Sequence, residues 1–178
     1  MGPPPNDQKR EERSVEPFHE QMEEYQQQLR KGVIQKAYRG LMDYLMGLKA
    51  HFKDQYPEYA VSGGIYYGYM DMTYFALFPE SLKGRGLKIA VVFLHEANRF
   101  EVWLAGSNKQ VQARYWKLFQ EGDWHKYTRV STTEGADSIL EHILADKPDF
   151  GDLDALTARI EKGTVRFIED VQSLLSEH

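Results

Sequence analysis

The sequence predicts a mixed α/β (α+β) fold in which helices flank a small antiparallel sheet. Apolar residues recur at helical spacing near both ends of the chain, whereas the middle third is rich in aromatic and β-branched residues that alternate as in strands. The loops between the three central strands are too short for the crossover that parallel neighbours need. We therefore expect a three-stranded antiparallel meander, extended by a short fourth strand, in the order α-α-β-β-β-α-β-α-α.

Length and composition restrict the class of protein. The chain has 178 residues, of which 42% are hydrophobic and 13% aromatic, so most of it can form a packed core. It contains no cysteine, which excludes disulfides, thiolate metal sites and cysteine nucleophiles. No apolar run approaches the ~20 residues that cross a bilayer, and the N-terminus lacks an apolar signal region. We expect a cytoplasmic protein without a membrane partner.

The N-terminal segment differs from the rest of the chain. Residues 1–17 hold four of the seven prolines and alternate charges of both signs, with almost no aliphatic residue. Such a composition cannot offset the entropy lost on ordering. The sequence predicts a disordered tail over 1–17 and a single globular domain over 18–178.

Helical spacing predicts helices on both sides of the sheet. Two of them precede the sheet, one follows the third strand, one covers 131–148 and one runs from 152 to the C-terminus. The helix over 131–148 rests on the capping-box spacing of Ser131 and Glu134. In the second helix Gly40 and Gly47 lie seven residues apart, which favours close approach of a neighbouring backbone.

The predicted strands cover four segments. The first is apolar on both faces and contains six aromatic residues in fourteen, as expected of a strand covered on both sides. The segments are 65–78, 87–95, 100–105 and a shorter one at 126–131.

The common phosphate-binding and nucleophile motifs are missing from the chain. There is no P-loop, no dinucleotide-binding glycine motif before a helix and no nucleophile elbow. His95 and Glu96 begin like a zincin motif, but Arg99 stands where the second histidine belongs. We expect no resident cofactor and no tightly bound metal.

The predicted topology is similar to the core of the PD-(D/E)xK nuclease superfamily. The resemblance implies an acid on one strand and an (Asp/Glu)-x-Lys on the next, which together hold Mg²⁺. Asp71 could supply the first acid. The third strand offers Glu101, but Trp103 occupies the lysine position, so the topology is similar and the active-site motif is incomplete.

At the level of residues, the segment from Tyr59 to Tyr115 resembles a family of small bacterial proteins that carry a domain of unknown function. The most distinctive part is RFEVWLAGSN, from Arg99 to Asn108. The resemblance implies a small bacterial cytosolic protein and no particular activity or ligand.

Two groups of residues could together line a binding cleft. Asp71 is the one charge in the first predicted strand, on the face that carries Tyr67 and Tyr69. Glu101 and Trp103 share a face of the third strand. If the two acids meet, a carboxylate pair with aromatic walls would form a small-molecule pocket.

Each feature also has a structural interpretation. Asp71 could be a buried acid satisfied by a tyrosine hydroxyl or an arginine. Trp103 could cover the core while Glu101 pairs with Arg99 or Arg114. We add Asn108 and Arg114, on the segment after the third strand, to the predicted binding residues.

A third feature is the distribution of charge. Residues 81–130 hold nine Lys or Arg and four Asp or Glu, together with all three tryptophans, in a chain of net charge -5. Basic and aromatic side chains in one region are typical of single-stranded nucleic-acid binding, although a solvated helix face has the same composition.

Because no nucleophile–base motif is found, the leading hypothesis is a non-catalytic binding or interaction domain with an aromatic, acid-containing cleft. Its partner would be a small molecule or a second copy of the chain. The alternatives are a nucleic-acid-associated protein and a divergent metal-dependent phosphodiesterase that uses Asp71 and Glu101.

Overall fold

The structure is a computed structural model that describes residues 16–122 and 124–178. It divides into two compact units, 1–43 and 44–178. The predicted disordered tail, except for its last two residues, lies outside the described residues.

The described part of the first unit is helical. Helix α1 (Phe18–Arg30) is followed by Gly32 with a φ of 72°, and α2 (Val33–Gln55) then begins and continues into the second unit. The predicted apolar stripe of α1 is exposed, since 76% of Phe18 and 54% of Tyr25 are accessible.

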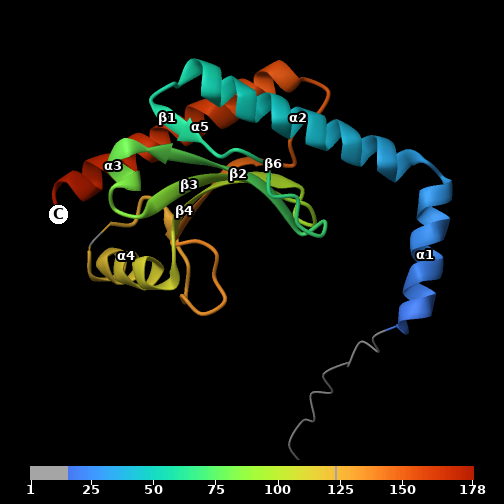
Figure 1. Ribbon diagram of the computed structural model, residues 1–178, viewed down its shortest axis with the longest axis horizontal. Coiled ribbons are helices and arrows are strands. Elements are labelled where there is room, and N and C mark those ends of the chain that lie inside the picture. The colour runs from blue at the N-terminus through green and yellow to red at the C-terminus, as the bar shows by residue number, and fades with distance from the viewer. Residues whose placement is uncertain (1–15, 123) are drawn as a thin grey trace, which may run out of the picture. The chain divides into compact units, whose positions relative to one another are not determined.

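The second unit is built on a six-stranded sheet whose neighbouring strands all pair antiparallel (Figure 1). The spatial order is β1-β2-β3-β4-β6-β5. The strands are β1 (Tyr59–Val61), β2 (Met72–Pro79), β3 (Leu87–Leu94), β4 (Arg99–Gly106), β5 (Thr128–Arg129) and β6 (Leu140–Asp146). The predicted α+β fold is confirmed, with β2, β3 and β4 as the meander and β5 as the short extra strand.

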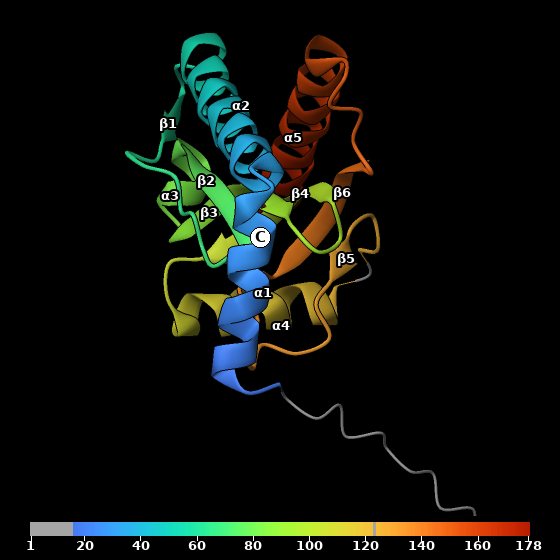
Figure 2. The ribbon, with the colours of Figure 1, turned by 90° about the vertical axis from the view of Figure 1, so that its right-hand side faces the viewer.

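One face of the sheet carries the main core. Phe75 of β2 packs on Phe52 of α2, with ring centroids 6.0 Å apart, and Phe100 of β4 packs on Tyr44. Helix α5 (Leu153–Ser176) lies beside this part of α2 on the same face (Figure 2). Its residue Phe167 is fully buried, as expected for a helix that covers a sheet.

The opposite face is covered only in part. Helix α4 (Lys109–Glu121) lies on this side, away from α2 and α5 (Figure 1). A second, smaller apolar cluster forms here from Ala90, Val92 and Trp103, with Met72 and Tyr74 packed against it. This partly open face provides the cavity described in the next subsection.

The largest difference from the sequence prediction is β6. The segment predicted as a helix over 131–148 forms a loop and then a strand that pairs with β4 and β5. A register shift between Phe100 and Glu101 breaks the two-residue alternation of buried positions in β6, so its pattern resembles a helix. Glu134 donates its backbone N–H to Thr132 Oγ1 in a local turn, and Gly135 has a φ of 69°.

Three smaller differences concern element boundaries and packing. The three-residue strand β1 and the one-turn helix α3 (Glu80–Lys83) were not predicted. Strand β2 begins seven residues later than expected, because Gly68 and Met70 adopt positive φ angles that a strand cannot contain. At Gly47 an added Cβ would meet no described atom within 4 Å, so the predicted close backbone approach is wrong there.

Candidate functional site

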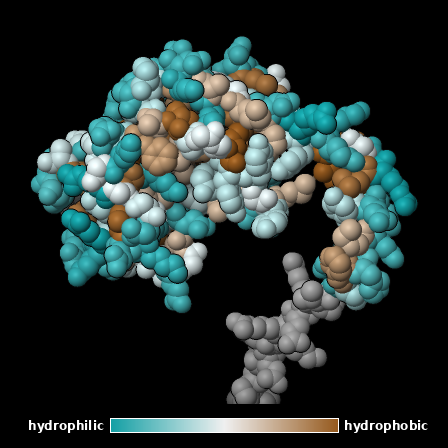
Figure 3. All heavy atoms as spheres, in the orientation of Figure 1, coloured by the Kyte–Doolittle hydropathy of each residue, from teal (hydrophilic) through white to brown (hydrophobic). Residues whose placement is uncertain are grey.

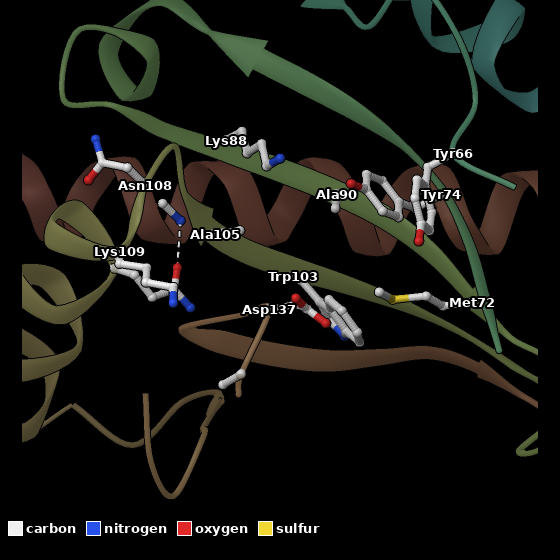
Figure 4. A pocket seen from close by; sticks show the side chains of 13 residues that line it. Tyr66, Met72, Tyr74, Lys88, Ala90, Trp103, Ala105, Asn108, Lys109 and Asp137 are labelled. Atoms are coloured by element: carbon white, nitrogen blue, oxygen red, sulfur yellow. Dashed lines mark hydrogen bonds between the residues drawn. The ribbon is translucent and has the colours of Figure 1, made fainter. Parts of the chain in front are cut away.

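A cavity of about 410 Å³ lies on the partly covered face of the sheet (Figure 4). Small side chains form its floor, because Ala90 of β3 and Ala105 of β4 face it. The register places Ala90 beside Trp103 and Ala105 beside Lys88, so larger side chains stand around a hollow. The cavity therefore follows from the alternation of small and large residues on one sheet face.

Aromatic side chains form one end of the cavity. Tyr66 and Tyr74 stack with ring centroids 5.0 Å apart, and their backbones exchange two hydrogen bonds of 2.8 and 3.0 Å. The loop before β2 thus folds back along the strand and brings a second ring to the wall. Burial raises the pKa of Tyr74, with a smaller contribution from Asp137, so its hydroxyl stays protonated at neutral pH.

The other end of the cavity is formed where β4 runs into α4. Asn108 is the N-cap of α4, and its side chain accepts a hydrogen bond from the Val111 backbone N–H at 2.9 Å. The Gly106 N–H donates to Gln112 Oε1 at 2.8 Å. A Cβ on Gly106 would lie 2.6 Å from the backbone nitrogen of Gln112, so only glycine allows the first turn of α4 to pack this closely.

The lining carries charges of both signs. Lys88 and Lys109 contribute two ammonium groups, and Asp137 contributes a carboxylate. Lys88 Nζ lies 5.8 Å from the centroid of the Tyr74 ring. Lys109 and Asn108 lie at the α4 end of the cavity, and Asp137 lies near Trp103 (Figure 4). The lining thus combines flat rings with a lysine at the α4 end.

Two of the predicted binding residues, Trp103 and Asn108, line this cavity. Glu101 does not line it and is only 6% exposed. Trp103 Nε1 donates to Glu101 Oε2 at 2.7 Å, and Arg99 Nη1 lies 3.6 Å from Glu101 Oε1. Burial raises the pKa of Glu101. Its position agrees with the structural interpretation, in which Glu101 pairs with Arg99.

Asp71 lies in the loop before β2 and not in the cavity lining. Its Oδ1 accepts a hydrogen bond from the Tyr69 backbone N–H at 2.8 Å, and such backbone contacts hold its pKa below the usual range. Tyr69 is 95% exposed and Tyr67 about half exposed in the same loop. The carboxylate acts as the acceptor of a local turn.

The predicted Asp71–Glu101 pair is not formed. Glu101 lies opposite Val92 in the middle of the sheet. Asp71 lies just before the start of β2, where its backbone carbonyl accepts a hydrogen bond from the His95 N–H. The odd-numbered positions of β2, such as Phe75, face the helices, and Glu101 lies on the other face. The expected pairing failed for two reasons: residue 71 precedes the strand, and an odd-numbered position of β2 would in any case face away from Glu101.

Arg114 lies on α4 but lines a different hollow, which it shares with Lys117 and Glu121. Its guanidinium carbon is 5.4 Å from the Tyr115 ring centroid. The geometry therefore separates Arg114 from Trp103 and Asn108.

Several basic residues of the 81–130 segment are engaged within the protein. Lys126 Nζ lies 2.7 Å from Asp170, and Lys117 lies 3.7 Å from Glu121. The Arg129 guanidinium stacks 4.8 Å from the Trp116 ring. These contacts reduce the charge that the segment can offer to a nucleic acid.

The described residues contain neither a metal-binding cluster nor a membrane-spanning helix. Over 16–122 and 124–178, no three His, Asp or Glu side chains converge as metal ligands would. Within the same residues no helix has the length and apolar character of a membrane span.

Most of the polar lining was missed by sequence reasoning. Lys88 could have been noticed as the only charge within an otherwise apolar strand, LKIAVVFL. Lys109 and Gln112 look like ordinary residues of a helix face. Asp137 lies in a loop that the sequence predicted to be helical, so no signal pointed to it.

The apolar residues on the face of the second unit seen in Figure 3 are scattered among hydrophilic ones. Scattered apolar residues are normal for a protein surface and indicate no extended docking patch on that face.

Comparison with known proteins places the chain in a family. A family model described as "Domain of unknown function (DUF7000)" matches residues 18–175. Neither the curated proteins nor the solved structures gave a significant match. Since the match covers most of the chain, the protein belongs to the DUF7000 family.

Proposed function

We propose that this protein is a non-catalytic binding domain whose cavity holds a small molecule with a flat ring system. The observation that carries the proposal is the cavity of about 410 Å³ between the rings of Tyr66, Tyr74 and Trp103. That volume lies in the range typical of small-molecule sites, and rings of this kind favour stacked or edge-on contact with a flat ligand.

The cavity walls are held in place before any ligand arrives. Trp103 is fixed by its hydrogen bond to Glu101, and Tyr74 by its stacking on Tyr66. A fixed wall reduces the entropy lost on binding and so favours affinity. Asp137 supplies the acidic group that the sequence hypothesis assigned to Asp71 and Glu101, and it would accept a hydrogen bond from a ring N–H.

A binding assay with four probes tests this proposal. Indole and adenosine are neutral flat molecules, and indole-3-carboxylate and AMP are their anionic counterparts. We expect at least one probe to bind saturably and to raise the thermal unfolding temperature of the full chain, because a ligand that binds only the folded state stabilises it.

Matched variants locate the binding. Ala105→Leu fills the floor of the cavity, whereas Ala113→Leu adds the same bulk at an exposed position of α4 outside it. Tyr66→Ala removes a wall ring that is 45% exposed, so it should fold normally. We expect Ala105→Leu and Tyr66→Ala to abolish or weaken binding and Ala113→Leu to preserve it. If none of the probes binds, or if both cavity variants bind as the wild type does, the proposal is wrong.

We also propose the other predicted partner, a second copy of the chain. It is supported by the exposed apolar stripe of α1, which includes Phe18 and Tyr25. Light scattering tests it, since a dimeric mass that becomes monomeric in Phe18→Ser would support it and a monomeric wild type would refute it. The cytoplasmic location is likewise proposed from the sequence.

A further inference from the structure

The amide of Gln112 shows which chemical group the α4 end of the cavity is built to receive. Gln112 is only 7% exposed and lines the cavity. Its Oε1 accepts from the Gly106 N–H at 2.8 Å, whereas its Nε2 is buried without a hydrogen-bond partner among the described residues. A buried donor without a partner is unfavourable and calls for an acceptor.

The orientation of this amide follows from its surroundings. Turning it over would place the NH₂ group against the Gly106 N–H, so that two donors would face each other. Gly106 therefore holds Oε1 in place and leaves Nε2 as the free donor.

Two further features make the same place attractive to a negative charge. Gln112 belongs to the first turn of the thirteen-residue helix α4, where the positive end of the helix dipole lies. Lys109, in the same turn, is exposed and lines the cavity. Asp137 lies nearer Trp103 (Figure 4), so its charge disfavours an anion there and favours one at the α4 end.

We propose that the ligand is a flat ring compound bearing a carboxylate or a phosphate, and that Lys109 Nζ and Gln112 Nε2 hold this anionic group at the start of α4. This inference rests on the proposed function and names its ligand class. The ring lies among the three aromatic side chains, and the anion lies beside the ammonium group of Lys109.

The four probes form two matched pairs that test the anionic group separately from the ring. We expect indole-3-carboxylate to bind at least tenfold more tightly than indole, or AMP than adenosine, since a hydrogen bond to a charged group contributes about this much. The pair that shows the difference distinguishes a carboxylate from a phosphate. The difference should shrink as salt is added.

Variants of α4 assign the effect to residues. Lys109→Gln removes the exposed ammonium, and Gln112→Glu keeps the acceptor for Gly106 while replacing the donor by a negative oxygen. We expect each to weaken binding of the anionic probe about tenfold and to weaken binding of the neutral probe much less. Lys117→Gln, an exposed lysine of the same helix that pairs with Glu121, is the control and should have no effect.

The outcomes separate this inference from the proposed function. If neutral and anionic probes bind equally well, or if Lys109→Gln binds the anionic probe as the wild type does, the anion subsite is refuted while the cavity still binds rings. If Gln112→Glu fails to fold, Lys109→Gln alone decides. If no probe of either kind binds, the proposed function and the inference fail together.

Discussion

At the scale of single residues, Glu101 shows how a predicted functional acid becomes a structural one. It is buried beside Trp103 and accepts a hydrogen bond from the indole N–H of that residue. Arg99 Nη1 lies 3.6 Å from Glu101 Oε1. Burial is the largest influence on its pKa and raises it, so the ionised form is disfavoured in the folded protein. The role of this residue is to fix the orientation of a cavity wall.

The raised pKa predicts a specific pH dependence of stability. The unfolded chain ionises Glu101 at the ordinary carboxyl pKa, whereas the folded protein does so at higher pH. The free energy of unfolding therefore falls as the pH rises from the ordinary value through the raised one, and this loss persists at neutral pH. Glu101→Gln keeps an acceptor for Trp103 and lacks this loss, so it should be relatively more stable at pH 7 than at pH 4.

Urea unfolding at several pH values measures this difference. Asp146→Asn is the control, because Asp146 also lies near Arg99 but is exposed. A difference between Glu101→Gln and the wild type that does not vary with pH would contradict the account.

The sequence identified some residues of the site and missed others for physical reasons. Trp103 was found because it belongs to β4, and Asn108 because it caps α4. Both the alternation of a strand and the residue type of a cap are local patterns in the sequence. Asp71 was assigned to a strand because its neighbours are apolar, but Met70 has a positive φ and the strand begins only at Met72. The unpartnered amide of Gln112 depends on Gly106, six residues away, and no local pattern reports such a contact.

At the scale of elements, α5 and β6 pack unusually closely. A Cβ added at Gly163 of α5 would lie 2.6 Å from Leu144 Cδ2, and Leu144 is only 4% exposed. A glycine in the middle of a helix lowers the stability of that helix. The structure gives the residue a packing role, because its lack of a side chain admits Leu144 of β6.

Two glycine substitutions test this packing. Gly47→Ala on α2 meets no described atom and should stabilise the protein by about 0.5–1 kcal/mol through helix propensity. Gly163→Ala gains the same propensity but forces the buried Leu144 side chain to shift, and the cost of this shift offsets the gain at least in part. We expect Gly163→Ala to be the less stable of the two in urea unfolding followed by circular dichroism. Equal stabilisation by both would show that β6 and α5 do not pack this closely.

The contact between α2 and α5 includes a polar cluster around Glu161. Tyr56 donates its hydroxyl to Glu161 Oε1 at 2.6 Å, and His51 Nε2 lies 2.7 Å from Oε2. The hydrogen bond from Tyr56 is the main reason why the pKa of Glu161 is lowered, and the same contact raises the pKa of Tyr56 to about 12.

A lowered pKa at Glu161 predicts the opposite pH dependence from that of Glu101. Its contribution is present above the ordinary carboxyl pKa and is lost as the pH falls through the lowered one. Glu161→Gln should reduce the free energy of unfolding by about 1 kcal/mol at pH 7 and by less in acid. Urea unfolding checks this, with Glu177→Gln at the exposed end of α5 as the control. A deficit that grows in acid would be inconsistent with the hydrogen bonds described.

At the scale of the whole molecule, the fold class was predictable and the detail of the sheet was not. Three strands joined by short loops can pair only as an antiparallel meander, so β2, β3 and β4 followed from the chain itself. Strand β6 joins the sheet through long-range pairing with β4, and the register shift at Glu101 conceals its alternation. The cavity is lined by β2, β3 and β4 together with α4 and two loops, so it could not be read from any one segment alone.

The most direct test is a crystal structure of the full chain with whichever anionic probe binds more tightly. The account predicts the ring of the probe beside Trp103 and Tyr74, with its carboxylate or phosphate within hydrogen-bond distance of Lys109 Nζ and Gln112 Nε2. A probe bound elsewhere on the protein, or one whose anionic group points away from the start of α4, would contradict it.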